Sequence, residues 1–96
     1  MATFALFCLD KPDAMPRRLA AREAHLAHVR EHAAIIKLAG PLLDDAGEMT
    51  GSMFVMEAAS RAEVEAFAAQ DPYKLADVFE RVDIRGYKIT VGAIQD

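Results

Sequence analysis

With 96 residues, the chain is long enough for one modest hydrophobic core, and we expect residues 1–96 to form a single domain. Hydrophobic residues make up 53% of the sequence, so part of the apolar surface is expected to need a second chain to cover it. The formal net charge of −4 argues against general nucleic-acid binding, which requires a basic face to neutralise phosphates.

The N-terminus and the single cysteine indicate the cellular setting. One cysteine, Cys8, excludes an internal disulfide and is typical of a reducing compartment. No basic segment precedes the first apolar run, and no apolar stretch approaches the length that spans a bilayer. We therefore expect a soluble cytoplasmic protein without membrane contact.

The first element is a short, nearly continuous apolar run at residues 3–9 (TFALFCL). This run predicts a strand that is buried on both faces. Alternation places Phe4, Leu6 and Cys8 on one side, where Cys8 is interpreted as a small core residue.

The longest helical pattern follows, with Asp13 as N-cap, Pro16 in the first turn and an end near Ile36. Arg22 falls inside an apolar stripe of this helix, and His25 lies on its flank. A guanidinium in an apolar stripe costs free energy unless it is paired or reaches water. Either Arg22 extends to solvent near the helix start, or Arg22 and His25 line a pocket beneath the helix. The stripe consists of Leu19, Leu26, Val29, Ala33 and Ile36.

Two further histidines on this helix, His28 and His32, have the i, i+4 spacing that could bind a metal ion. They point away from the predicted stripe and lack a nearby third ligand. We therefore expect both to face solvent, and no metal site is predicted.

A hairpin and a second helix come next. A strand through Gly40 and Pro41 to Leu43, a polar turn at residues 44–48 and an apolar strand at residues 51–56 predict the hairpin. The second helix is expected to begin at a capping box and to end at Gln70. The capping box is Ser60-Arg61-Ala62-Glu63.

The last part of the chain predicts a short helical turn and a final strand. Asp71 is a plausible N-cap for the turn, with Pro72 at its first position and an end at Phe79. The final strand is expected to span residues 82–93, with a bulge at Arg85-Gly86, where the apolar phase changes. The order strand, helix, strand, strand, helix, strand is the ferredoxin-like α+β pattern. Two helices would cover one face of a four-stranded antiparallel sheet.

Four short motifs resemble the YciI-like (YCII-related) family, and the resemblance covers nearly the whole chain. They are Arg22-x-x-His25-Leu26, Ala39-Gly40-Pro41, Thr50-Gly51-Ser52 and Asp71-Pro72-Tyr73. The resemblance implies a dimeric α/β-barrel assembly of ferredoxin-like subunits, similar to muconolactone isomerase. It also implies a His–Asp active site, which here would be His25 and Asp71.

Helix geometry is compatible with this pair, because His25 and Asp71 lie at similar heights on the two predicted helices, roughly three turns from their starts. Asp71 could cap a helix and bind an imidazole at the same time, since a carboxylate has two oxygens. The pair predicts proton transfer, with His25 as general acid or base and Asp71 fixing its tautomer.

The predicted function is isomerase or lyase chemistry on a small anionic organic substrate, without a cofactor. The alternative is a non-catalytic small-molecule-binding or assembly domain that uses the same pocket. Because residues 3–9 and 51–56 are apolar on both faces, we also expect a homodimer through the sheet face that the helices leave open. The predicted substrate-binding residues are Arg22, Gly40, Pro41, Ser52 and Tyr73.

Overall fold

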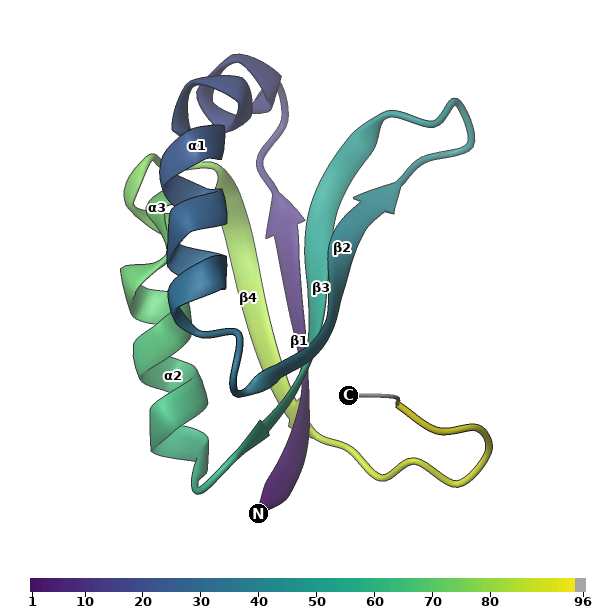
Figure 1. Ribbon diagram of the computed structural model, residues 1–96. Helices are drawn as coiled ribbons and strands as arrows, with labels where there is room; N and C mark the ends of the chain where they lie inside the picture. Colours follow the sequence, from purple (N-terminus) through teal and green to yellow (C-terminus); the bar gives the residue numbers. More distant parts are fainter. Residues whose placement is uncertain (95–96) are drawn as a thin grey trace.

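The structure is a computed structural model, and it describes residues 1–94 of the chain. Its elements follow the predicted β-α-β-β-α-β order, and the predicted short helix precedes the last strand (Figure 1). They are β1 (Ala2–Asp10), α1 (Met15–Glu31), β2 (Ile36–Leu43), β3 (Met49–Ala58), α2 (Arg61–Gln70), α3 (Pro72–Leu75) and β4 (Phe79–Gly86).

The four strands form one antiparallel sheet in the order β2-β3-β1-β4, with β1 and β3 at its centre. In this register Leu6 of β1 lies between Phe54 of β3 and Ile84 of β4. All three helices lie on one face of the sheet (Figure 1). The predicted ferredoxin-like α+β fold is therefore confirmed. No helix within residues 1–94 is long and apolar enough to cross a membrane.

The core lies between the central strands and the helices. The predicted alternation in β1 is confirmed, because Phe4, Leu6 and Cys8 are all buried and face Val64 and Phe67 of α2 in one cluster. Burial raises the pKa of the Cys8 thiol to about 12. Cys8 is thus a neutral packing residue at physiological pH, as expected.

The apolar stripe predicted for α1 is wrong in phase. Leu19 is 57% exposed and Leu26 is 38% exposed, whereas the buried face of the helix carries Arg18, His25 and His28. Polar side chains can occupy this face because partners elsewhere in the fold satisfy their hydrogen bonds.

Both predicted ends of α1 also require correction. Asp13 has a left-handed φ of 57°, and the N-cap position is Ala14, which makes no side-chain cap bond. The helix ends at Glu31, five residues before the predicted end at Ile36. Ile36 instead pairs with Met56 in the sheet, so the intervening residues must turn the chain from the helix layer to the strand layer.

Two boundaries near the C-terminus differ from the prediction as well. The short helix α3 ends at Leu75, because Phe79 already pairs with Asp10 as the first residue of β4. The last strand ends at Gly86, which pairs with Phe4, and the backbone N–H of Tyr87 continues the contact with a hydrogen bond of 2.9 Å to the carbonyl oxygen of Thr3. The register shift lies at Leu9/Asp10 in β1, not at Arg85-Gly86.

Candidate functional site

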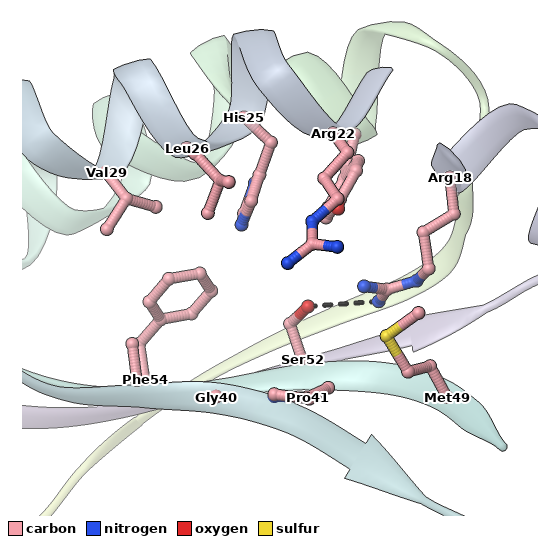
Figure 2. Close-up of a pocket in the computed structure, with 12 residues that line it drawn as sticks. Arg18, Arg22, His25, Leu26, Val29, Gly40, Pro41, Met49, Ser52 and Phe54 are labelled. Carbon is pink, nitrogen blue, oxygen red and sulfur yellow. Dashed lines mark hydrogen bonds between the residues drawn. The ribbon is translucent and has the colours of Figure 1, made fainter. Parts of the chain in front are cut away.

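A cavity of about 280 Å³ opens between α1 and the hairpin formed by β2 and β3 (Figure 2). All five predicted substrate-binding residues line it together with His25, whereas Asp71 lies behind the cavity wall. The lining residues are Arg18, Arg22, His25, Leu26 and Val29 of α1, Ala39, Gly40 and Pro41 of β2, Met49, Ser52 and Phe54 of β3, and Tyr73 of α3.

The structure places His25 and Asp71 in direct contact. The Nδ1 atom of His25 lies 2.8 Å from Oδ1 of Asp71, and the carboxylate residue is only 1% exposed. An ionised carboxylate only accepts hydrogen bonds, so Nδ1 is the donor, and in the neutral ring this assignment leaves the lone pair on Nε2. The imidazole extends from α1 into the cavity, so this second nitrogen is the one that can meet a ligand (Figure 2).

Asp71 caps α3 with the same oxygen that holds the imidazole. Its Oδ1 accepts a hydrogen bond of 2.9 Å from the backbone N–H of Tyr73 as well as the bond from His25. The expected division of the two roles between two oxygens is therefore wrong. Since the cap fixes the carboxylate relative to α3, the start of this short helix also fixes the orientation of His25.

Tyr73 supports the imidazole from one side. Its ring is stacked on His25, with centroids 3.9 Å apart and an interplanar angle of 12°. Burial raises the pKa of the phenol, although the nearby Arg18 guanidinium acts in the opposite direction. Tyr73 is thus a neutral aromatic support at physiological pH.

Arg18 is a site residue that the sequence analysis missed. Its guanidinium binds Asp10 through two hydrogen bonds, Nε–Oδ2 at 2.9 Å and Nη2–Oδ1 at 3.1 Å. It also donates to Oγ of Ser52 at 3.0 Å and lies 4.6 Å from the centre of the Tyr73 ring. A signal was present, because Arg18, Arg22 and His25 have the i, i+4, i+7 spacing of one helix face.

Arg22 lies one turn further along α1 and differs from Arg18 in its partners. Arg18 is 3% exposed and its charge is compensated by Asp10. Arg22 is exposed, and within residues 1–94 it forms no hydrogen bond or ion pair. Its guanidinium extends into the cavity beside His25 (Figure 2), so it both reaches solvent and lines the pocket. Arg22 is therefore the cation that remains available to an anionic ligand.

The two glycines of the predicted motifs have different roles. A Cβ atom on Gly51 would lie 2.4 Å from the carbonyl oxygen of Cys8, so only glycine allows β1 and β3 to approach this closely. This approach sets the position of the neighbouring Ser52 in the cavity. A Cβ atom on Gly40 would meet nothing within 4 Å, so packing does not require glycine at this position.

The expectation that both remaining histidines face solvent is wrong for His28. This residue is 8% exposed, its Nε2 lies 2.9 Å from the carbonyl oxygen of Phe67, and its ring is stacked on the Phe67 ring at 4.6 Å. The expected lack of a third ligand-type residue is also wrong. Donor atoms of Glu31, His28 and His32 lie within 4.8 Å of one another.

The four-stranded antiparallel sheet with its helices on one face is the ferredoxin-like α+β fold. Residues 2–88 match the YCII-related domain, and the chain belongs to this family. It is 32% identical to Protein YciI of Escherichia coli O6:H1 over 93 residues, which cover 88% of this chain and 95% of that protein. An uncharacterized protein of Haemophilus influenzae is 33% identical over 93 residues, which cover 88% of this chain and 95% of that protein.

Two solved structures illustrate the range of similarity. One is 5-chloro-2-hydroxyhydroquinone dehydrochlorinase of Burkholderia phenoliruptrix in complex with 2,5-dihydroxybenzoquinone. It is 33% identical, with a TM-score of 0.83 over 90% of this chain and 93% of that chain. A putative antibiotic biosynthesis monooxygenase from Bacteroides thetaiotaomicron shares only 7% identity, with a TM-score of 0.59 over 99% of this chain and 94% of that chain. The second similarity concerns the fold alone.

Proposed function

We propose that this chain is an enzyme that transfers protons on small anionic ring compounds, in reactions of the isomerase or lyase type. The observation that carries the proposal is the buried hydrogen bond between His25 Nδ1 and Asp71, which leaves Nε2 of His25 free toward the cavity. A histidine held in this way can accept a proton on Nε2 and return it later in the cycle.

Asp71 has two tasks in this mechanism. Its hydrogen bond selects the tautomer in which Nε2 is the basic atom. Its negative charge stabilises the positive charge that forms on the ring of His25 during proton transfer. Stacking on Tyr73 keeps the imidazole in one orientation throughout.

The remaining lining residues define the class of substrate. Arg22 offers a guanidinium to a phenolate, enolate or carboxylate oxygen. Phe54, Val29 and Leu26 provide apolar contacts, so a flat ring with ionised oxygens on its edge complements the cavity. The volume of about 280 Å³ suits a compound with a single ring.

The similar dehydrochlorinase supports this assignment, because its structure contains 2,5-dihydroxybenzoquinone, a flat ring with acidic hydroxyl groups. Loss of HCl from a chlorinated trihydroxybenzene is a lyase reaction. The substrate gives up one proton and one chloride ion and becomes a hydroxyquinone, and no external oxidant is consumed. A base such as His25 beside a cation such as Arg22 suits this chemistry.

The test is to supply 5-chloro-2-hydroxyhydroquinone to the purified chain and to measure chloride release above the spontaneous rate. Calorimetry with 2,5-dihydroxybenzoquinone measures binding separately. We expect the wild-type chain to bind and to turn over, and the His25→Gln variant to bind but to lose turnover. Equal binding by both proteins without chloride release would favour the alternative of a small-molecule-binding domain. Absence of both binding and turnover would contradict the proposed substrate class.

We also infer that the chain forms a homodimer through the sheet face that the helices leave open. Phe7 and Met53 face each other across β1 and β3 on that side, and Leu38 of β2 on the same side is 58% exposed. An apolar patch of this kind is typical of an interface. Light scattering at low micromolar concentration should give twice the mass of the chain. A monomer mass would contradict the dimer.

A further inference from the structure

At the other end of α1, we propose that His28, Glu31 and His32 form a binding site for a divalent transition-metal ion such as Zn²⁺. One donor atom from each side chain lies within 4.8 Å of the other two. His28 and Glu31 lie in the last turn of α1, and His32 directly follows the helix. Their i, i+3 and i+4 spacing places the three side chains on one face. This inference is independent of the proposed function.

The hydrogen bonds of the two imidazoles leave one nitrogen of each ring free to coordinate. Nε2 of His28 lies 2.9 Å from the carbonyl oxygen of Phe67, and Nδ1 of His32 lies 2.8 Å from the carbonyl oxygen of His28. A carbonyl oxygen only accepts, so each of these nitrogens carries a proton. The second nitrogen of each ring therefore retains the lone pair that a metal ion requires. A histidine that donates its other N–H to a backbone carbonyl is the usual arrangement around bound metal ions.

Packing holds the two rings near their binding positions. His28 is stacked on Phe67 at 4.6 Å, and His32 meets the edge of the same ring at 5.1 Å. Metal–donor distances of about 2.0–2.2 Å require the three donors to approach further. His32 is half-buried and Glu31 is exposed, so both side chains can rotate toward an ion. A neighbouring cavity of about 260 Å³, which Glu31 and His32 line, has room for water ligands.

Electrostatics and ligand type indicate which ions the site prefers. The backbone carbonyls at the end of a helix form the negative pole of the helix dipole, and the Glu31 carboxylate adds a full negative charge. Two imidazoles and one carboxylate suit Zn²⁺, Ni²⁺ or Cu²⁺, whereas Mg²⁺ and Ca²⁺ prefer oxygen ligands alone. His25 takes no part, since its Nδ1 is bonded to Asp71 and its ring lies in the other cavity.

The test uses the full chain without a polyhistidine tag, titrated with Zn²⁺ by calorimetry. The chain has only three histidines, so the imidazole signals in NMR spectra identify which rings bind. We expect one Zn²⁺ per chain, with shifts of the His28 and His32 signals and none at His25. Mg²⁺ should cause no shift at the three rings.

Two variants and one matched control complete the design. His32→Gln should weaken Zn²⁺ binding more than about tenfold, and Glu31→Gln should weaken it severalfold. Glu31 is exposed and His32 is half-buried, so circular dichroism should show that both variants keep the fold. Glu23→Gln removes the same charge from an exposed position on α1 outside the cluster and should bind Zn²⁺ as the wild type does.

Three results would overturn the proposal. The first is a wild-type chain that binds no Zn²⁺, and the second is a Zn²⁺-dependent shift that appears only at His25. The third is unchanged affinity in His32→Gln. Unchanged affinity in Glu31→Gln alone would overturn the assignment of Glu31 as the third ligand.

Discussion

Two histidines on α1, His25 and His28, occupy nearly identical surroundings and yet differ in chemistry. Each is 8% exposed and each ring is stacked on an aromatic side chain, Tyr73 at 3.9 Å or Phe67 at 4.6 Å. Each uses one ring nitrogen in a buried hydrogen bond, with lengths of 2.8 Å and 2.9 Å. The partner of His25 is the Asp71 carboxylate, whereas the partner of His28 is the backbone carbonyl of Phe67.

In the proposed function, the difference between these partners separates the histidine that transfers protons from one that stabilises the fold. Both acceptors fix the tautomer of the ring, but only a carboxylate supplies a charge that can stabilise an imidazolium as it forms. Of the two, His25 alone directs its second nitrogen into the cavity of Arg22, a cation that forms no hydrogen bond or ion pair within residues 1–94. Burial and stacking alone therefore do not identify the histidine that we propose as the base. The charge of its partner and its access to a ligand do.

The largest effect is expected from His25→Gln, which removes the proposed base and keeps a polar side chain of similar size. Turnover should fall by about 10²–10⁴-fold, the range that general acid–base catalysis supplies. Binding of 2,5-dihydroxybenzoquinone should change much less, because Arg22 and the apolar wall remain. Chloride release and calorimetry measure the two quantities. A turnover number within about threefold of the wild type would show that His25 is not the base.

The next substitution, Asp71→Asn, makes the partner of His25 resemble the neutral partner of His28. The amide oxygen can still accept from His25 and from the backbone N–H of Tyr73, so the cap survives while the charge disappears. Turnover should fall by about 10²-fold, with little change in the free energy of unfolding.

The control is Asp71→Ala, which removes both the charge and the cap. The free energy of unfolding should fall by about 1 kcal/mol because the cap is lost. It should fall by about a further 1–3 kcal/mol because the N–H of His25 is left unpaired. Urea unfolding measures these losses. If Asp71→Asn turned over like the wild type, the contrast between the carboxylate and the carbonyl would carry no catalytic meaning.

The third substitution, His28→Ala, tests the other side of the comparison. It leaves the carbonyl of Phe67 without its donor and removes the stacked ring, so the free energy of unfolding should fall by about 2–3 kcal/mol. His28→Gln should recover part of this loss, because its amide can donate to the same carbonyl. Urea unfolding checks both variants. A loss no larger than that of a surface substitution, about 0.5 kcal/mol, would contradict the structural role of His28.

The smallest effect is expected from Arg22→Gln, which sharpens the comparison at the cavity around His25. Loss of one charge-assisted hydrogen bond should weaken binding of 2,5-dihydroxybenzoquinone by about tenfold. In the turnover assay the same loss should raise KM more than it lowers kcat. The effect should decrease at high salt, because Arg22 is exposed. Calorimetry at two salt concentrations measures both. Unchanged affinity would indicate that the anion binds elsewhere in the cavity.

Local patterns in the sequence were sufficient for most of the fold. The nearly continuous apolar run at residues 3–9 predicted a buried strand, and the alternation of side chains between the two faces of a strand placed Phe4, Leu6 and Cys8 together. The motif Asp71-Pro72 identified a helix start, because aspartate accepts from the free N–H groups and proline needs no partner for its own nitrogen. The order of these elements then indicated the ferredoxin-like sheet.

The phase of α1 and the roles of its basic residues were decided only by the tertiary structure. A helical pattern establishes the angles between side chains, but not which of two adjacent stripes faces the sheet. That choice depends on partners that are distant along the chain: Asp71 lies 46 residues from His25, and Phe67 lies 39 residues from His28. Their buried hydrogen bonds turn Arg18, His25 and His28 inward and leave Leu19 exposed, against the hydrophobic pattern. The sequence by itself therefore determined the fold and the types of side chain near the cavity, and the packed structure decided which of them meet.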